Sequence, residues 1–261
     1  VHAVVAPAIS SQFVYAKLGQ VLKGIKELGF YEIVEAALGA DIVALAEAKE
    51  LTEKGFLTSS CCPAFVNMVN KDFPELSDAV STTVSPMCAV SRMIKASDAD
   101  AVTVFIGPCI GKKSEIVDQD IKDNADYVLT YSEIRAIMRA KDVELEADDT
   151  SYQESSIYGK RFANSGGVTA AVLESLKEKN EEADCKVCKA NGAAECKKAL
   201  LLMKAGKLPE DFIEGMACEG GCIGGPCALT HAAKDRSLID KYASKTTKKE
   251  ILKNINNIKT Y

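Results

Sequence analysis

The chain has 261 residues, of which 47% are hydrophobic and 26% charged, and its formal net charge at pH 7 is −5. A chain of this length can bury the core of one large domain or of two lobes, and the acidic balance argues against a nucleic-acid partner, which would select a basic surface. The sequence has no apolar run near the roughly 20 residues that span a membrane and no signal peptide, which predicts a cytoplasmic protein without membrane contact.

The first part of the chain alternates between strand and helix patterns. Residues 1–7 form an apolar run that predicts a buried strand ending at Pro7. Residues 19–30 carry apolar side chains at helical spacing, with a glycine near the end as the predicted C-cap. A short strand is expected over residues 31–36, followed by a helix over residues 40–54.

The same alternation continues through the middle of the chain. Residues 55–62 and 101–109 are strand patterns that each run into a cysteine-bearing loop. Residues 126–141 predict a strand followed by a helix with Ser132 as its N-cap. The polar stretch 179–196 is expected to be an irregular, exposed excursion between helices. Alternating strands and helices indicate an α/β fold with mainly parallel pairing.

Ten cysteines are the most informative feature, because those in four segments lie near Gly or Pro where predicted strands turn into helices. A disulfide framework is disfavoured, since a chain of this size has a core and needs no covalent staples. Thiolates are the preferred ligands of iron–sulfur clusters, and glycine lets the backbone approach a bulky inorganic core. Four segments follow the pattern: TSSCCPAF (58–65), SPMCAVSRMIK (85–95), FIGPCIGKKSEI (105–116) and EGMACEGGCIGG (214–225).

The other cysteines leave alternatives open. Cys185, Cys188 and Cys196 have C-x2-C-x7-C spacing, which suits part of a zinc site or an accessory cluster, but no fourth ligand is evident. Cys88 lies in an apolar helical pattern and is expected to be buried as a small hydrophobe. Cys227 either lines a pocket or simply packs.

Three of the cysteine segments, taken in order, resemble the signature segments of the catalytic domain of the iron-only (FeFe) hydrogenases. The family segments read approximately TSCCPxW, PCxxKKxE and MACxGGCxxGG, and this chain has SSCCPAF, PCIGKKSE and MACEGGCIGG with comparable gaps. The resemblance implies two lobes, each a small twisted, mainly parallel sheet flanked by helices, with the cofactor in the cleft between them. We place lobe one at about 1–101 plus C-terminal helices at about 236–261, and lobe two at about 102–235.

The resemblance also implies a cofactor, the H-cluster, and the residues that hold it. Four cysteines would ligate a four-iron cubane (4Fe-4S cluster), and one of them, Cys222, would bridge to a diiron unit that carries CO, cyanide and azadithiolate. Lys112 matches the family lysine that makes a charge-assisted hydrogen bond to a cyanide. The matching cubane ligands are Cys62, Cys109, Cys218 and Cys222, and the matching pocket-wall residues are Ser85, Pro86, Ala6, Pro7 and Met216.

A route for protons is implied in the same way. Cys61 occupies the position of the family's proton-transfer cysteine, and Glu47 and Glu50 lie three positions apart on one helix face. Together with Ser81 they match the family relay to solvent. The expected order is Cys61, Glu47, Ser81 and Glu50, with Lys54 near the surface end. Such a relay needs groups that exchange protons near neutral pH.

Several positions depart from the family pattern, which is typical of divergent branches in which packing and hydrogen bonding around the cofactor differ. Two alternatives to catalysis therefore remain, a hydrogen sensor with low turnover and a non-catalytic iron–sulfur assembly protein. Cys61 and Lys112 count against the assembly protein, which needs neither. The departures are Gly107 for methionine, Met87 for glutamine, Phe65 for tryptophan and Ser59 for threonine.

The leading expectation is an enzyme that reversibly oxidises H2 to two protons and two electrons. No ferredoxin-like cysteine run precedes the first motif. Electrons are therefore expected from a ferredoxin-like carrier, or from upstream iron–sulfur domains if the chain, which begins at Val1, is a fragment. Maturation proteins that assemble the diiron unit are further expected partners.

Overall fold

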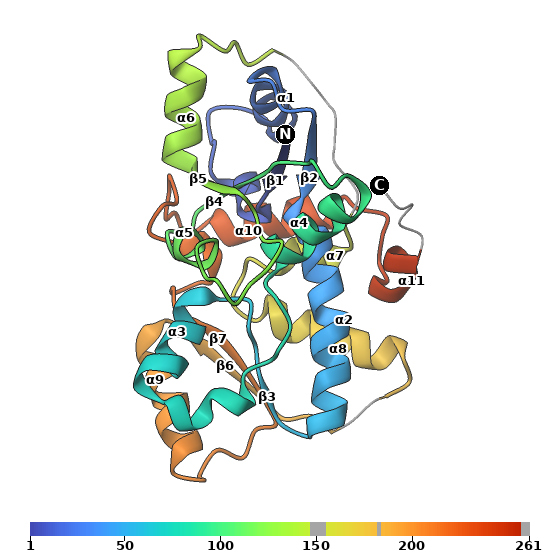
Figure 1. Ribbon diagram of the computed structural model, residues 1–261, viewed down its shortest axis with the longest axis vertical. Helices are drawn as coiled ribbons and strands as arrows, with labels where there is room; N and C mark the ends of the chain where they lie inside the picture. Colours follow the sequence, from blue (N-terminus) through green and yellow to red (C-terminus); the bar gives the residue numbers. More distant parts are fainter. Residues whose placement is uncertain (147–154, 182–183, 257–261) are drawn as a thin grey trace.

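The computed structural model describes residues 1–146, 155–181 and 184–256. Within these residues two β-sheets lie one above the other along the long axis of the molecule, with helices around both (Figure 1). Helix α2 (Ala36–Lys54) packs against both sheets, through Leu38 on the upper one and Ala44 on the lower one. None of the described helices is both long enough and apolar enough to cross a membrane.

The upper sheet has the strand order β2-β1-β4-β5, and every pair is parallel. Both faces are covered, which explains why its strands read as continuous apolar runs. Val5 faces a core that includes α1 (Leu18–Glu27) and α6 (Tyr131–Ala140), and Val4 faces a core that includes α4 (Pro86–Ser97). The strands are β1 (His2–Val5), β2 (Glu32–Glu35), β4 (Thr103–Gly107) and β5 (Tyr127–Thr130).

The lower sheet has the parallel order β3-β7-β6. Phe212 faces a core shared with α2 and α8, and its neighbour Ile213 faces the opposite core under α3 and α9. The elements are β3 (Leu57–Thr58), α3 (Pro63–Asp72), α8 (Gly167–Glu178), β6 (Val187–Asn191), α9 (Ala193–Lys204) and β7 (Phe212–Met216).

Short helices complete the described chain and connect the two sheets. They are η1 (Pro7–Ser11), η2 (Pro74–Ala79), α5 (Gly111–Glu115), α7 (Ile157–Arg161), η3 (Cys222–Gly224), α10 (Asp235–Ser244) and α11 (Ile251–Asn256).

The α/β class with parallel pairing is confirmed, but the predicted lobe boundaries do not match the strand pairing. Strands β4 and β5, expected in lobe two, extend the sheet of β1, whereas β3, expected in lobe one, pairs with β7. The reason is that α2 carries the chain from the upper sheet to the lower one, and α4 leads it back into β4. Hydrophobic periodicity marks strands without assigning them to a sheet.

Two local predictions were wrong. Thr130, and not Ser132, caps α6, because Thr130 and Glu133 have the spacing of a capping box and bond each other's backbone N–H groups. The stretch 179–196, apart from residues 182 and 183, which lie outside the described residues, contains strand β6 and the start of α9. β6 is an edge strand that pairs with β7 on one side only, so it is half-exposed. Its polar sequence does not predict a strand, because pairing with β7 stabilises the strand.

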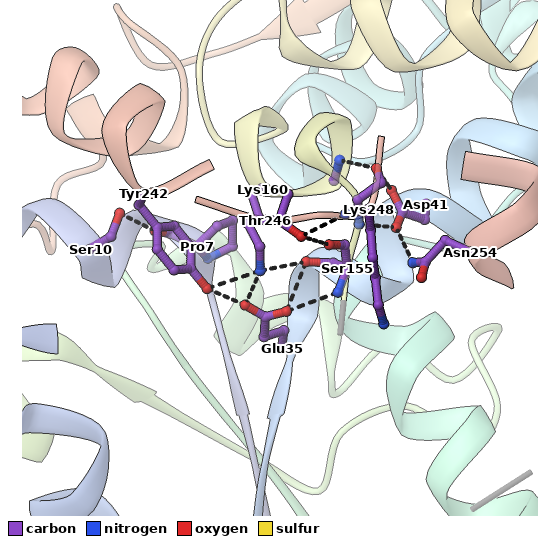
Figure 2. A network of polar contacts seen from close by, with 12 residues as sticks. Pro7, Ser10, Glu35, Asp41, Ser155, Lys160, Tyr242, Thr246, Lys248 and Asn254 are labelled. Carbon is purple, nitrogen blue, oxygen red and sulfur yellow. Dashed lines mark hydrogen bonds and ion pairs between the residues drawn. The ribbon is translucent and has the colours of Figure 1, made fainter. Parts of the chain in front are cut away.

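A buried ammonium group joins three elements at the carboxyl end of β2 (Figure 2). Lys160 on α7 is fully buried and donates hydrogen bonds to Glu35, to Ser155 Oγ at 3.0 Å and to the Tyr242 hydroxyl at 3.2 Å. Glu35 ends β2 and Tyr242 lies on α10. The ion pair therefore holds a C-terminal helix against the strand that leads into α2.

Asp41 on α2 extends this network to α11 (Figure 2). Its carboxylate accepts hydrogen bonds from the Ser156 N–H at 2.7 Å and from Asn254 Nδ2 at 3.1 Å. Burial raises the pKa of Asp41 to about 6, against the opposing effect of these hydrogen bonds. The network thus anchors both C-terminal helices to the first turns of α2.

Replacing Lys160 with methionine is expected to lower the free energy of unfolding by about 3–5 kcal/mol, because the Glu35 carboxylate stays buried without its cation. Urea denaturation of the purified chain measures this. The matched control is Lys204→Met, which removes an exposed ion pair with Glu75 and is expected to leave stability nearly unchanged. Equal losses in the two variants would contradict the structural importance of the buried pair.

Candidate functional site

A cavity of about 100 Å³ lies where the carboxyl ends of strands from both sheets meet. In the upper sheet the chain runs from β1 outward to β2 on one side, and from β4 to β5 on the other. Such a reversal of strand order is where open parallel sheets bind ligands. The lining residues that directly follow strands are Ala6 and Pro7 after β1, Pro108 and Cys109 after β4, Cys61 and Cys62 after β3, and Ala217 and Cys218 after β7.

Small and apolar side chains make up most of the cavity wall. Ala36, Ala37 and Ala40 present the first turns of α2 to the cavity, and Phe162 and Ala163 close it after α7. The sequence reasoning did not name these five residues, although the run of small residues at the start of α2 was a possible signal. An apolar wall of this kind strengthens any electrostatic interaction inside the cavity, because it keeps water out.

Five thiols line this cavity, and four of them, the predicted cluster ligands, interact with one another. Burial is the main cause of the raised pKa values of Cys109, Cys218 and Cys222, and it raises that of Cys218 to about 11. The charges of neighbouring thiolates, including that of Cys62, raise all three pKa values further. All ten cysteines of the chain are free of disulfides. Thiolates in such a site need cations to neutralise them, which is what a bound metal supplies.

The arrangement of the four thiols suits a cluster better than a single ion. Among the described residues, no three His, Cys, Asp or Glu side chains converge on one metal-ion position. Cys62, Cys109, Cys218 and Cys222 nevertheless share one cavity, so a group of several irons can reach all of them. The donor chemistry and the apolar wall therefore fit an iron–sulfur cofactor.

The backbone around the ligand loop is held tightly in place. The Cys222 N–H donates to the Ala163 carbonyl at 2.7 Å, and the Ser165 N–H donates to the Gly220 carbonyl at 3.0 Å. Gly221 has a φ of +87°, and a Cβ there would come within 2.6 Å of the Ala163 oxygen. Only glycine suits this close approach, which accounts for the glycines of the third motif.

Lys112 extends from α5 into the cavity and is buried. Its Nζ lies 2.6 Å from Glu115 Oε2 and donates to the Cys61 carbonyl at 3.3 Å. Burial opposes the charge, but the adjacent Glu115 carboxylate outweighs it and raises the pKa of Lys112. Ser85 was expected to line the cavity, but it is not among the lining residues. Its hydroxyl instead donates a hydrogen bond to Glu115. Glu115, which the sequence reasoning missed, sits in the KKSE motif three residues after Lys112.

Of the other predicted wall residues, Pro86 and Met216 lie on the cavity surface together with Ala6 and Pro7. Met216 is also almost fully buried at the end of β7. The structure thus gathers nine of the ten predicted cofactor contacts around one cavity, with Ser85 outside it.

Cys61 and Glu47 form the inner end of the predicted proton relay. Glu47 is fully buried, and its Oε1 accepts hydrogen bonds from the Ser60 N–H at 2.9 Å and from Ser60 Oγ at 3.3 Å. Burial raises the pKa of Glu47 to about 8 despite these hydrogen bonds. Burial and then the Glu47 charge raise the pKa of Cys61 well above its usual range. Both side chains can therefore hold a proton near neutral pH.

Ser81 and Glu50 form the outer end. Ser81 Oγ donates to Glu50 Oε2 at 2.6 Å, and Lys54 Nζ lies 2.7 Å from Glu50 Oε1. Burial opposes ionisation of Glu50, but hydrogen bonds from Lys54, Ser81 and Thr82 outweigh it and lower the pKa of Glu50. No hydrogen bond within the described part of the chain runs directly from Glu47 to Ser81, so the two ends are separate.

Three of the remaining cysteines are divided between the two sides of the lower sheet. Cys185 packs against the α2 and α8 side of the lower sheet, whereas Cys188 and Cys196 pack on the α3 and α9 side. Cys88 is fully buried on α4, as expected. Cys227 is not among the residues that line the cavity, and its N–H donates to the Pro108 carbonyl at 3.0 Å.

Three departures from the family pattern lie in tightly packed surroundings near the cavity. A Cβ at Gly107 would lie 2.5 Å from the Phe105 ring, so Phe105 fills the space where a larger side chain would stand. Phe65 packs against the backbone of Gly215, where a Cβ would come within 2.3 Å of the ring, and Ser59 Oγ accepts a hydrogen bond from the Gly215 N–H at 3.1 Å.

Comparison with known proteins identifies related chains. The family of the iron only hydrogenase large subunit, C-terminal domain, matches residues 1–226. Iron hydrogenase 1 from Clostridium pasteurianum is 28% identical over 260 aligned positions, covering 79% of this chain and 45% of that protein. The cytosolic Fe-S cluster assembly factor NAR1 from Candida dubliniensis is 32% identical over 112 positions, covering 38% of this chain and 19% of that protein.

Solved structures show the same fold. Apo [FeFe]-hydrogenase HydA1 from Chlamydomonas reinhardtii, in a single-residue variant, superposes with a TM-score of 0.76 at 20% identity, covering 98% of this chain and 87% of that chain. The chain spans about half the length of the curated relatives that it matches, between 45% and 61% for three hydrogenases. From its match over residues 1–226, the chain belongs to the family of the iron only hydrogenase large subunit, C-terminal domain.

Proposed function

We propose that this domain holds a four-iron cubane linked to a diiron unit and reversibly oxidises H2 to two protons and two electrons. Membership of the family supports a domain that binds an iron–sulfur cluster and is related to the hydrogenases. The observation that carries the finer proposal is that four interacting thiols, the charged Lys112 and Cys61 line one apolar cavity, with the buried Glu47 close enough to raise the pKa of Cys61. An iron–sulfur protein without hydrogen chemistry has no use for the last three.

The residues of the cavity would divide the work among them. When bound, the cofactor supplies the iron centre at which H2 is split or formed. Cys62, Cys109, Cys218 and Cys222 would hold the cubane, and Cys222 would also bridge to the diiron unit. Lys112, kept charged by Glu115, would donate to an anionic ligand such as cyanide. Ala6, Pro7, Pro86 and Met216 would exclude water.

Proton transfer is assigned to the buried titratable groups. Cys61 would exchange a proton with the reaction centre and pass it to Glu47, whose pKa of about 8 lets it both hold and release a proton near neutral pH. Ser81, Glu50 and Lys54 would carry the proton to the surface along the hydrogen bonds that join them.

The partners are proposed by chemistry. A ferredoxin-like carrier, or iron–sulfur domains in a longer chain, would exchange electrons with the cubane, and maturation proteins would insert the diiron unit. Ten cysteines without a disulfide suit a reducing compartment such as the cytoplasm.

Non-catalytic iron–sulfur assembly is the second candidate, favoured by the similarity to NAR1 over 112 positions. The repacking of Phe105 over Gly107 near the cavity favours a third, a hydrogen sensor with low turnover. The buried relay pair Cys61 and Glu47 argues against the assembly function, because burying a carboxylate is costly and assembly chemistry does not use it.

Cys218→Ser is expected to abolish cubane binding, since one of four thiolate ligands is lost. After anaerobic reconstitution, the unchanged chain should carry about four irons with the broad visible absorption of a 4Fe-4S cluster, and the variant should not. Cys185→Ser is the control and should retain the cluster, because Cys185 does not line the cavity. If Cys185→Ser lost as much iron as Cys218→Ser, the proposed ligand set would be wrong.

Loading the reconstituted chain with a synthetic diiron cofactor tests the function itself. Infrared bands of protein-bound CO and cyanide, together with hydrogen evolution from a reduced carrier, are expected. Bands without turnover would favour the sensor. An intact cubane with no such bands would reject the hydrogenase proposal and leave an assembly protein.

Glu47→Gln is expected to change how stability depends on pH. Glu47 has a pKa of about 8 in the fold against 4.5 for the free side chain, so its stabilising contribution is present at low pH and is lost as the pH rises from 4.5 through 8. Glutamine stays neutral, so the variant should keep its stability over this range. Urea unfolding at several pH values measures the slope, and Glu50→Gln is the control because the Glu50 pKa is lowered. An unaltered slope in Glu47→Gln would show that Glu47 is ionised in the fold.

A further inference from the structure

A polar groove on the surface reaches the inner end of the relay at a point that the expected route does not use. The groove measures about 570 Å³ and runs between α3 and the segment from residue 80 to residue 85, towards the end of α5. Ser60, Ser81, Thr82 and Thr83 line it, whereas Glu50 and Lys54 are not among its lining residues. The groove therefore brings solvent to Ser60 directly, as well as to Ser81 of the expected route.

Ser60 connects this groove with Glu47. Its Oγ lies 3.3 Å from Glu47 Oε1, its N–H donates to the same oxygen at 2.9 Å, and it is half-buried at the groove wall. The hydroxyl also donates to the Thr83 carbonyl at 2.5 Å. A single hydroxyl thus touches the buried carboxyl on one side and lines open polar space on the other.

The outer end of the relay, formed by Ser81 and Glu50, makes its hydrogen bonds with residues other than Glu47. Ser81 donates to Glu50 at 2.6 Å and accepts from the Thr83 N–H at 3.1 Å. Glu50 is paired with Lys54, and its pKa is lowered, so it takes up a proton less readily than Glu47 does. Within the described residues, Ser60 is the hydroxyl that bonds Glu47 directly.

We propose that Ser60 relays protons between Glu47 and water in this groove, as an exit parallel to the branch through Ser81 and Glu50. In the outward step the Ser60 hydroxyl turns from the Thr83 carbonyl to groove water, and the protonated Glu47 carboxyl gives its proton to Ser60 Oγ as the hydroxyl gives its own proton to that water. The O–H bond of Glu47 breaks, a new O–H bond forms at Ser60, and the released proton leaves as hydronium. The inward step is the reverse. The contribution to hydrogen turnover rests on the proposed function, whereas the route to Glu47 does not.

Proton exchange at Glu47 tests the route without any cofactor. Rapid transfer of the full chain from H2O to D2O should shift the infrared C=O band of protonated Glu47, which its loss in Glu47→Gln identifies. Ser60→Val and Ser60→Thr form a matched pair, because they have similar volume and only threonine keeps the hydroxyl. We expect exchange to slow by at least about tenfold in Ser60→Val and to stay near the unchanged rate in Ser60→Thr.

Ser81→Ala reports on the other branch and should slow the exchange less than Ser60→Val does. An exchange rate in Ser60→Val equal to that of the unchanged chain would overturn the proposal, and so would an equal or larger slowing in Ser81→Ala. If Ser60→Val does not fold, Ser60→Ala takes its place with the same expected slowing and the same overturning result.

Hydrogen evolution by the cofactor-loaded chain separates this proposal from the proposed function. Ser60→Val should lower the rate per bound diiron unit and enlarge the solvent deuterium isotope effect, and Ser60→Thr should restore both, which a purely structural role of Ser60 would not predict. Slowed exchange at Glu47 in a chain that makes no hydrogen would reject the function and keep the route. Full turnover and unchanged exchange in Ser60→Val would reject the route and keep the function.

Discussion

The rest of the structure depends on keeping ionisable groups apart from water in one apolar cavity. Thiols and an ammonium group surround space that alanine, proline and phenylalanine close off, and a charge in such a place is stable only beside a fixed partner. Lys112 has Glu115, and the thiolates need a metal cluster. The two parallel sheets matter because their carboxyl ends deliver these side chains from four different strands to one point.

The same principle separates two glutamates that are three residues apart on α2. Glu47 faces the interior and has a pKa raised to about 8, whereas Glu50 meets Lys54, Ser81 and Thr82 and has a lowered pKa. Environments that push two pKa values apart are how acid and base roles are assigned at one pH. The ion pair of Lys160 and Glu35 fixes the N-terminal end of α2. It thereby helps to position the helix that carries Glu47.

Prediction from sequence was accurate where local chemistry decides. The strand before Pro7, the helix within residues 19–30 and the buried Cys88 all follow from apolar periodicity and from the stereochemistry of proline. It failed where partners distant in sequence decide. The strand Val187–Asn191 is polar enough to read as a loop and exists because β7 pairs with it, and Ser85 turned from the cavity to Glu115, a partner thirty positions away.

The sequence by itself determined the family resemblance, the α/β class and which cysteines belong to one site, because motif spacing and period-dependent patterns are local properties of the chain. Only the tertiary structure decided which strands share a sheet, that Glu47 is fully buried while Glu50 meets Lys54, and that Ser60 lies between a buried carboxyl and an open groove. These properties depend on burial and on contacts between distant residues, which no window of sequence contains.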